Sequence, residues 1–263
     1  MQTRIKGIDN GKPFDWDNAA AAYAKFRDIY PPVFYEKIAA KGLCVREQSV
    51  LDVGTGTGVL PRNMYRFGAK WTGADSSERQ IEEARRLTRD AGMDIAYILS
   101  PAEDLSLPPR SFDVITACQC LAYFQPERAA NKFAELLKEN GKLLVLYTAW
   151  LPREDAIAGA SEALTLRYNP DWSGAGETVR PIALPTAFLD RFELLSHEEY
   201  RLSVPFTRES WHGRMLSCRG VSASLTGEKL RAWEEEHRTL LRRIAPERFQ
   251  IAHYAAMAEL RAK

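Results

Sequence analysis

The sequence predicts an α/β fold, in which a mostly parallel sheet carries helices on both faces. Strand and helix signals alternate from Ser49 onward, a rhythm typical of βαβ units. Residues 50–58 read as a buried strand that stops at a turn with three alternate glycines, and a helix follows. A second strand ends at Asp75, as the first does near Asp52. Ligands bind at the carboxyl ends of parallel strands, so both acidic residues are expected at a ligand site.

Composition excludes several classes of protein. The chain has 263 residues, 45% of them hydrophobic and 27% charged, which is the balance of a soluble globular protein. With 36 Lys and Arg against 35 Asp and Glu, the net charge of +1 favours neither a nucleic acid nor an anionic membrane as partner. No apolar run approaches the roughly 20 residues of a bilayer span, and the first residues lack a secretory signal. The four cysteines have neither metal-site nor disulfide spacing, so we expect reduced thiols, no metal and a cytoplasmic location.

The N-terminal residues 1–45 are expected to be helical and are rich in aromatic residues. Pro31 and Pro32 end one helix and begin another. Two interpretations are open: the segment packs against the core, or it forms a cap over the ligand.

The later elements follow from local signals. Residues 60–67 predict a helix and residues 69–74 a strand, after which Ser77 and Gln80 form a capping box that opens a helix ending at Gly92. Residues 151–185 are expected to be a long connection, and residues 205–247 an insertion whose loops carry specificity. Further strands are predicted at 94–99, 112–117, 142–148, 193–204 and 249–260, and further helices at 126–139, 210–217 and 228–244.

Two positions have two interpretations each. An acidic residue such as Asp75 at a strand end accepts both hydroxyls of a ribose, or it caps the next helix, a role that Ser76 and Ser77 also suit. Cys118 and Cys120 point to one side of an extended chain, where they suit a soft metal or simple burial.

The glycine spacing separates two cofactors. A dinucleotide site has the pattern G-x-G-x-x-G, and Val59 occupies the position of its third glycine. The chain has D-x-G-x-G-x-G from Asp52, which resembles motif I of the class I S-adenosylmethionine (SAM)-dependent methyltransferases. In that family the glycine turn approaches the amino acid part of SAM, and the acidic residue helps to hold its ammonium group.

Other segments resemble the same family. Residues 23–31 are similar to its Y-A-x-x-R-x-x-Y-P segment, and residues 102–114 to A-E-x-L-P followed by S-F-D-x-V. Residues 141–144 look like the start of its fifth strand, so the resemblance covers about residues 46–150. Many members have an aspartate that contacts the adenine amino group at the position of Pro101. In this chain we therefore expect Glu103 or Asp104 to make that contact.

The resemblance implies a Rossmann-like, three-layer α/β/α fold with seven strands, the last of them antiparallel. It implies one domain over residues 1–263, with an N-terminal helical cap (1–45), a SAM-binding core (46–150), and the remaining strands plus acceptor lids (151–263). The residues that it implies in SAM binding are Asp52, Gly54, Thr55, Gly56, Gly58, Asp75, Ser76, Gln80, Ala102, Glu103, Cys118 and Gln119.

The implied reaction is in-line transfer of a methyl group from SAM to a small molecule, which leaves S-adenosylhomocysteine. The C-terminal lids look like those of ubiquinone-biosynthesis and trans-aconitate methyltransferases. His212 is the expected base and Tyr23 an orienting hydroxyl, whereas the other three histidines are expected to be structural. Expected acceptor contacts are Tyr30, Tyr147, Trp150, Trp211 and Arg214.

Two alternatives remain open at this point. A non-catalytic SAM-binding protein would share everything up to residue 150. An NAD(P)-dependent oxidoreductase would share the sheet, although Val59 argues against it. The sequence favours neither a monomer nor a homodimer.

Overall fold

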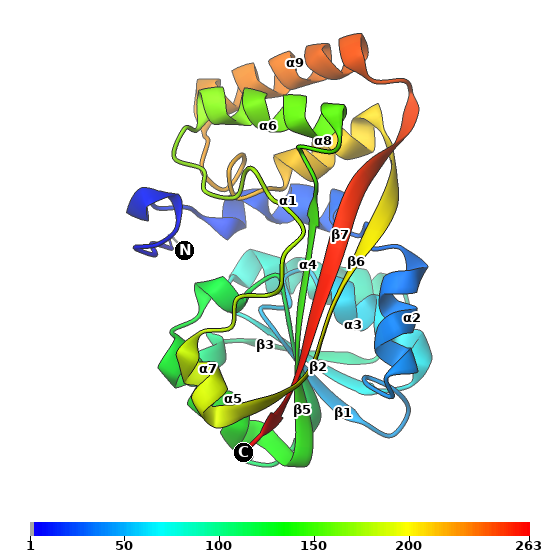
Figure 1. Ribbon diagram of the computed structural model, residues 1–263, viewed down its shortest axis with the longest axis vertical. Coiled ribbons are helices and arrows are strands. Elements are labelled where there is room, and N and C mark those ends of the chain that lie inside the picture. The colour runs from blue at the N-terminus through cyan, green and yellow to red at the C-terminus, as the bar shows by residue number, and fades with distance from the viewer. Residues whose placement is uncertain (1–2) are drawn as a thin grey trace. The chain divides into compact units, whose positions relative to one another are not determined.

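The computed structural model describes residues 3–263 and contains one seven-stranded sheet. Its strand order is β3-β2-β1-β4-β5-β7-β6, and the pairs β2–β3, β1–β2, β1–β4 and β4–β5 are parallel. β7 runs opposite to β5 and β6 (Figure 1), so the sheet is mixed and the expected α/β fold is confirmed. The strands are β1 (Ser49–Val53), β2 (Lys70–Asp75), β3 (Ile95–Leu99), β4 (Phe112–Cys118), β5 (Leu137–Trp150), β6 (Phe192–Thr207) and β7 (Arg248–Ala262).

Two helices begin at residues that the sequence marks as helix starts. Ser77 accepts a hydrogen bond from the backbone N–H of Gln80 and starts α4, and Pro32 opens α2 as predicted. The helices are α1 (Trp16–Phe26), α2 (Pro32–Ala40), α3 (Val59–Met64), α4 (Glu78–Asp90), α5 (Pro126–Leu136), α6 (Ala156–Tyr168), α7 (Thr186–Arg191), α8 (Arg208–Leu216) and α9 (Gly227–Ile244). Among residues 3–263, no helix is both long enough and apolar enough to cross a bilayer.

The chain divides into two compact units. The sheet unit comprises residues 30–148, 180–200 and 255–263, and the helical unit comprises residues 3–29, 149–179 and 201–254. Each unit therefore collects three separate stretches of the chain. The division into cap, core and lids stays a prediction.

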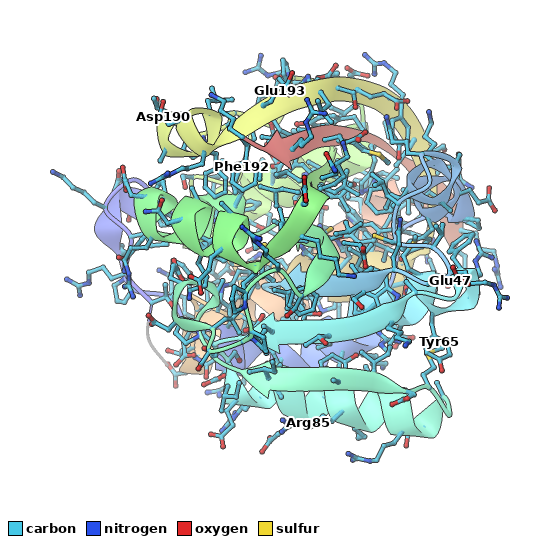
Figure 2. All side chains as sticks on the ribbon, turned by 90° about the horizontal axis from the view of Figure 1, so that it is seen from below. Glu47, Tyr65, Arg85, Asp190, Phe192 and Glu193 are labelled. Atoms are coloured by element: carbon cyan, nitrogen blue, oxygen red, sulfur yellow. The ribbon has the colours of Figure 1, made fainter. Side chains whose placement is uncertain are left out.

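The core of the sheet unit forms where helices cover the strands. Alternate side chains of β1, β4 and β5 pack against α5 and α7, with Phe133 and Phe188 buried between them. β6 begins with buried Phe192, and the next residue, Glu193, is exposed (Figure 2). α3 and α4 contact β2, and α4 also contacts β3.

The helical unit has its own core. α8 contacts both α1 and α9, and α6 packs against α9 (Figure 1). Its N-terminal residues are held by a buried ion pair in which the Arg219 guanidinium lies 2.7 Å from the Asp9 carboxylate. Ser173 donates to the same carboxylate through its hydroxyl and its backbone N–H. Charge and hydrogen bonds together compensate the burial of Asp9.

The structure corrects two expectations about helices. The predicted helix 126–139 ends at Leu136, because Leu137 is extended and pairs with Phe112 of β4. The sheet thus takes residues 137–139 into β5. The expected connection 151–185 contains α6, whose N-cap Asp155 accepts hydrogen bonds from the N–H groups of Ile157 and Ala158.

The turn after β1 yields a test of backbone and packing constraints. Gly54 has φ +63°, and a Cβ there would lie 2.7 Å from the Cβ of Cys120. We expect Gly54→Ala to lower the free energy of unfolding by about 2–4 kcal/mol, since it adds a steric clash to an unfavourable φ. Chemical denaturation of the purified chain measures the change.

Gly92→Ala is the matched control, because Gly92 also has φ +63° but a Cβ added there would have no atom within 4 Å. Its cost should be about 1 kcal/mol, the penalty of the backbone conformation alone. Equal losses in the two variants would show that contact with Cys120 does not constrain the turn.

Candidate functional site

The glycine turn connects β1 to α3 with a left-handed backbone. Gly54, Gly56 and Gly58 have φ values of 63°, 56° and 72°. Glycine adopts such values at little cost, which explains why three alternate positions lack a side chain. Between them, the Thr55 N–H donates to the Ala74 carbonyl at 3.0 Å and so ties the turn to β2.

Asp52 lies buried beneath this turn, with only 2% of its surface exposed. Its carboxylate accepts hydrogen bonds from the hydroxyls of Thr55 and Thr116, both at 2.6 Å. Burial raises the pKa of Asp52 to about 7, the two hydroxyl bonds oppose that shift, and the Asp75 charge adds to it. A cation bound at the turn would favour the ionised carboxylate.

Asp75 ends β2 beside the same turn. One carboxylate oxygen accepts from the Gly56 N–H at 2.8 Å and the other from the Ser77 N–H at 2.9 Å. Ser77, rather than Asp75, is the N-cap of α4. Ser76 is exposed, and Gln80 is buried in the first turn of α4. Asp75 is half-buried, so its carboxylate fixes the turn and also reaches the surface.

The segment after β3 is held by its acidic side chains. Ala102 is buried, and Glu103 accepts a hydrogen bond from the Gln125 N–H at 2.7 Å. Asp104 forms an exposed ion pair with Arg128. Glu103 therefore binds the residue before α5, and Asp104 binds the first turn of that helix.

The carboxyl end of β4 contributes Cys118, Gln119 and Cys120. The Cys118 sulfur lies 3.9 Å from the Tyr30 hydroxyl, whereas the buried Cys120 thiol donates to the Val53 carbonyl at 3.1 Å. Burial raises the pKa of Cys120 well above its usual value, which keeps the thiol neutral. Over residues 3–263, no cluster of ligating side chains suits a metal ion.

Gln119 has φ +67°, and its side-chain amide donates to the Thr148 carbonyl of β5. Tyr147, also on β5, is half-buried. β2, β1, β4 and β5 are adjacent in the sheet, and their carboxyl ends lie on the same side of it. The expected cofactor residues at these strand ends are therefore close together.

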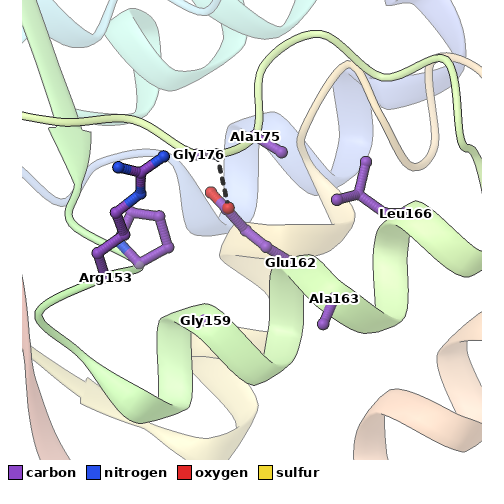
Figure 3. A pocket seen from close by; sticks show the side chains of 8 residues that line it. Arg153, Gly159, Glu162, Ala163, Leu166, Ala175 and Gly176 are labelled. Carbon is purple, nitrogen blue, oxygen red and sulfur yellow. Dashed lines mark hydrogen bonds between the residues drawn. The ribbon is translucent and has the colours of Figure 1, made fainter.

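The helical unit brings three of the expected acceptor residues together. The Trp150 and Trp211 rings are 5.5 Å apart and perpendicular, and the Arg214 guanidinium lies 4.7 Å above the Trp150 ring. Trp150 donates to the buried Glu162 carboxylate, which also accepts from the Gly176 N–H at 2.8 Å. Figure 3 shows this second bond at the wall of an open pocket of about 340 Å³, lined by Pro152, Arg153, Gly159, Glu162, Ala163, Leu166, Ala175 and Gly176.

His212 and Tyr23, the expected catalytic pair, have different neighbours within this unit. His212 is 2% exposed and stacks on Trp233 and His237, and its Nδ1 lies 2.9 Å from Nδ1 of His237. Burial lowers the pKa of His212 to about 4. The Tyr23 ring lies 4.8 Å from the Arg27 guanidinium.

His253 has surroundings that the sequence analysis did not anticipate. It lies in β7, 1% exposed, with its ring centroid 6.5 Å from that of Trp150 and 6.4 Å from that of Trp211. The strand pattern around it indicated a structural residue. Only the packing of distant segments reveals its position among the expected acceptor contacts.

Known proteins share parts of this sequence. Residues 50–141 match the family model of the methyltransferase domain. Ubiquinone biosynthesis O-methyltransferases of Pseudoalteromonas translucida and Xanthomonas euvesicatoria are 32% identical over 139 residues and 34% identical over 123 residues. These matches cover 51% and 46% of this chain, and the chain spans 59% and 52% of the relatives, little more than half of their length.

Solved structures share the fold over most of the chain. The YcgJ protein of Bacillus subtilis has a TM-score of 0.51 at 17% identity, covering 85% of this chain and 96% of that one. A structure solved for the conversion of a disulfide bond into a thioacetal group during echinomycin biosynthesis has a TM-score of 0.53 at 15% identity. It covers 97% of this chain and 88% of its own. The glycine turn, Asp52 and Asp75 all lie inside residues 50–141, the segment that matches the methyltransferase domain.

Proposed function

We propose that this chain transfers a methyl group from SAM to a hydroxyl oxygen of a small molecule. The observation that carries the proposal is the methyltransferase match over residues 50–141, which contains the glycine turn and both acidic strand ends. The curated relatives are named O-methyltransferases, and this favours oxygen over nitrogen, sulfur or carbon as the methyl acceptor. All four cysteines are free thiols, which suits a reducing compartment such as the cytoplasm.

The chemistry requires position more than reactive side chains. The methyl group of a sulfonium is already activated, and the acceptor oxygen attacks it in line with the departing sulfur. Holding the two at attack distance and excluding water supply most of the acceleration.

In this proposal the sheet unit holds SAM. The glycine turn lets the backbone approach the amino acid part of SAM, with Asp52 supplying negative charge for its ammonium group. Asp75 accepts hydrogen bonds from the ribose hydroxyls, a role that its half-exposed carboxylate suits. A non-catalytic SAM-binding protein would use the same residues, so turnover has to be measured.

Release of S-adenosylhomocysteine from SAM tests the function. The candidate methyl acceptors to be compared are catechol, thiophenol, benzylamine and benzoate. We expect turnover with catechol, because it supplies a hydroxyl group. Turnover with a different member only would move the proposal to another acceptor atom. Tight SAM binding without any turnover would favour the non-catalytic alternative.

Replacing Asp75 tests the ribose contact. Asp75→Asn should weaken SAM binding by about tenfold or more, because the charged acceptor of two hydroxyl hydrogen bonds is lost. Titration calorimetry measures the affinity. Asp90→Asn is the control, since Asp90 is an exposed residue at the end of α4 and pairs only at the surface with Arg86. Wild-type affinity in Asp75→Asn would remove Asp75 from the cofactor site.

The pKa of Asp52 predicts how SAM binding varies with pH. With a pKa of about 7, the carboxyl is mostly protonated at pH 6 and must lose its proton to pair with cationic SAM. Affinity should therefore rise by up to about tenfold per pH unit as the pH approaches 7 from below, and then level off. Asp52→Asn should bind weakly with little pH dependence. A flat wild-type profile between pH 5.5 and 7.5 would contradict this coupling.

A further inference from the structure

The open pocket beside α6 has a buried carboxylate in its wall. The Glu162 side chain accepts one hydrogen bond on each oxygen, from the indole N–H of Trp150 and from the Gly176 N–H. An ionised carboxylate can accept about four hydrogen bonds, so each oxygen has a lone pair left. Within the described residues 3–263, no lysine, arginine or histidine forms an ion pair with Glu162. Buried charges are normally paired, and this one has no cation beside it.

The electrostatic surroundings of Glu162 favour a cation. Burial raises the pKa of Glu162, the hydrogen bonds from Gly176 and Trp150 oppose this shift, and the negative charge of Glu177 adds to it. A cationic group beside the carboxylate would offset part of the burial penalty and favour the ionised form. The free lone pairs therefore suit an ammonium group, which donates three hydrogen bonds.

Arg153 supplies the opposite charge at the same pocket. It is exposed, and among residues 3–263 its guanidinium has neither an ion pair nor a hydrogen bond. Figure 3 shows the Arg153 and Glu162 side chains extending into the pocket, one from the loop before α6 and the other from the helix itself. A guanidinium binds a carboxylate through two parallel hydrogen bonds. Both charged groups are thus available to one ligand.

The loop that carries Arg153 is fixed on both sides of this residue. The Leu151 N–H donates to the Ala252 carbonyl at 2.8 Å, and the Ala252 N–H donates to the Asp155 carboxylate at 3.0 Å. Asp155 is also the N-cap of α6, so the loop is joined to both β7 and the helix. Only the side chain of Arg153 has to be ordered when a ligand binds, which keeps the entropic cost of binding low.

The other walls of the pocket are small and apolar. Gly159, Ala163 and Leu166 follow one another along one face of α6, and Ala175 lies on the segment opposite. A Cβ on Gly159 would lie 2.6 Å from the Pro152 carbonyl oxygen, so glycine lets the loop approach the helix. The volume of about 340 Å³ is at the lower end of the range of small-molecule sites. These walls suit a short apolar group.

We propose that this pocket binds a small zwitterion, namely an α-amino acid with an apolar side chain. The carboxylate of the ligand pairs with Arg153, its ammonium group pairs with Glu162, and its side chain lies against Ala163 and Leu166. A ligand with only one charge satisfies one protein group and meets the like charge of the other, so the pocket selects the zwitterion. All of these residues belong to the helical unit, and the inference does not rest on the methyl transfer proposed above.

Titration calorimetry of the full chain with L-valine, L-leucine and L-phenylalanine tests the proposal. The amino acid that binds most tightly is then compared with its amine, which lacks the carboxylate, and with its carboxylic acid, which lacks the amino group. The zwitterion should bind at least about tenfold more tightly than either analogue, because each analogue loses one charged contact. No binding of any of the three amino acids at millimolar concentration would overturn the proposal, as would equal affinity for the zwitterion and one analogue.

Variants of the pocket identify the contacts. Arg153→Ala should remove the advantage of the zwitterion over the amine, and Glu162→Gln its advantage over the carboxylic acid. Ala163→Phe, at an exposed position of α6, should abolish binding by filling the pocket. Arg231→Ala should keep wild-type affinity, because Arg231 is an exposed residue of α9 that does not line the pocket. Arg153→Ala and Ala163→Phe change exposed side chains, so they remain informative if Glu162→Gln fails to fold. Wild-type affinity in either of them would overturn the assignment.

SAM has an α-amino acid group of its own, so the glycine turn is a competing site for the same probes. Asp52→Asn should leave the affinity for the amino acid unchanged. Amino-acid binding that is lost in Asp52→Asn and kept in Arg153→Ala would overturn the proposal and place the ligand at the turn. The release of S-adenosylhomocysteine with catechol is measured without the amino acid, so the two proposals can fail separately.

Discussion

The ligand end of the sheet depends on a turn that has almost no room for side chains. A Cβ on Gly54 would enter Cys120, and a Cβ on Gly58 would lie 2.3 Å from the Tyr97 hydroxyl. Asp75 holds the backbone of this turn, because its carboxylate accepts a hydrogen bond from the Gly56 N–H. The same few atoms therefore set the path of the chain, and the glycines keep side chains out of the turn. Asp52 lies buried beneath them, and burial raises its pKa to about 7.

The two units offer opposite electrostatic environments. In the sheet unit, two carboxyl groups lie close together, and the negative charge of Asp75 raises the pKa of Asp52. In the helical unit, burial and nearby guanidinium groups keep His212, His237 and His253 neutral. Acidic groups therefore gather at the carboxyl ends of β1 and β2, whereas the buried imidazoles of the helical unit carry no charge at neutral pH.

Features that depend on contacts between residues close in the sequence could be predicted, whereas features that depend on contacts between distant segments could not. The glycine turn and the end of β2 lie within one βαβ unit, where local pattern and strand order suffice. α6 escaped detection because its many small residues lack an apolar stripe, although Asp155 marks its start. The end of α5 depends on pairing with β4, which no helical pattern reveals. The contact between His253 and Trp150 was harder still to predict, since these two residues meet only through the tertiary fold. The cofactor roles of the individual sheet-unit residues stay predictions.

The strand order also constrains the sequence of events in folding. β7 lies between β5 and β6 in the sheet but follows both in the sequence, so β6 has no neighbour in the sheet until β7 has been synthesised. The ion pair between Asp9 and Arg219 likewise waits for a residue 210 positions later. Residues 30–148 contain five consecutive strands that are adjacent in the sheet and can associate early. The helical unit, by contrast, needs residues 201–254 as well as residues 3–29, and until β7 pairs, β5 is an open edge of the sheet to which another strand can add.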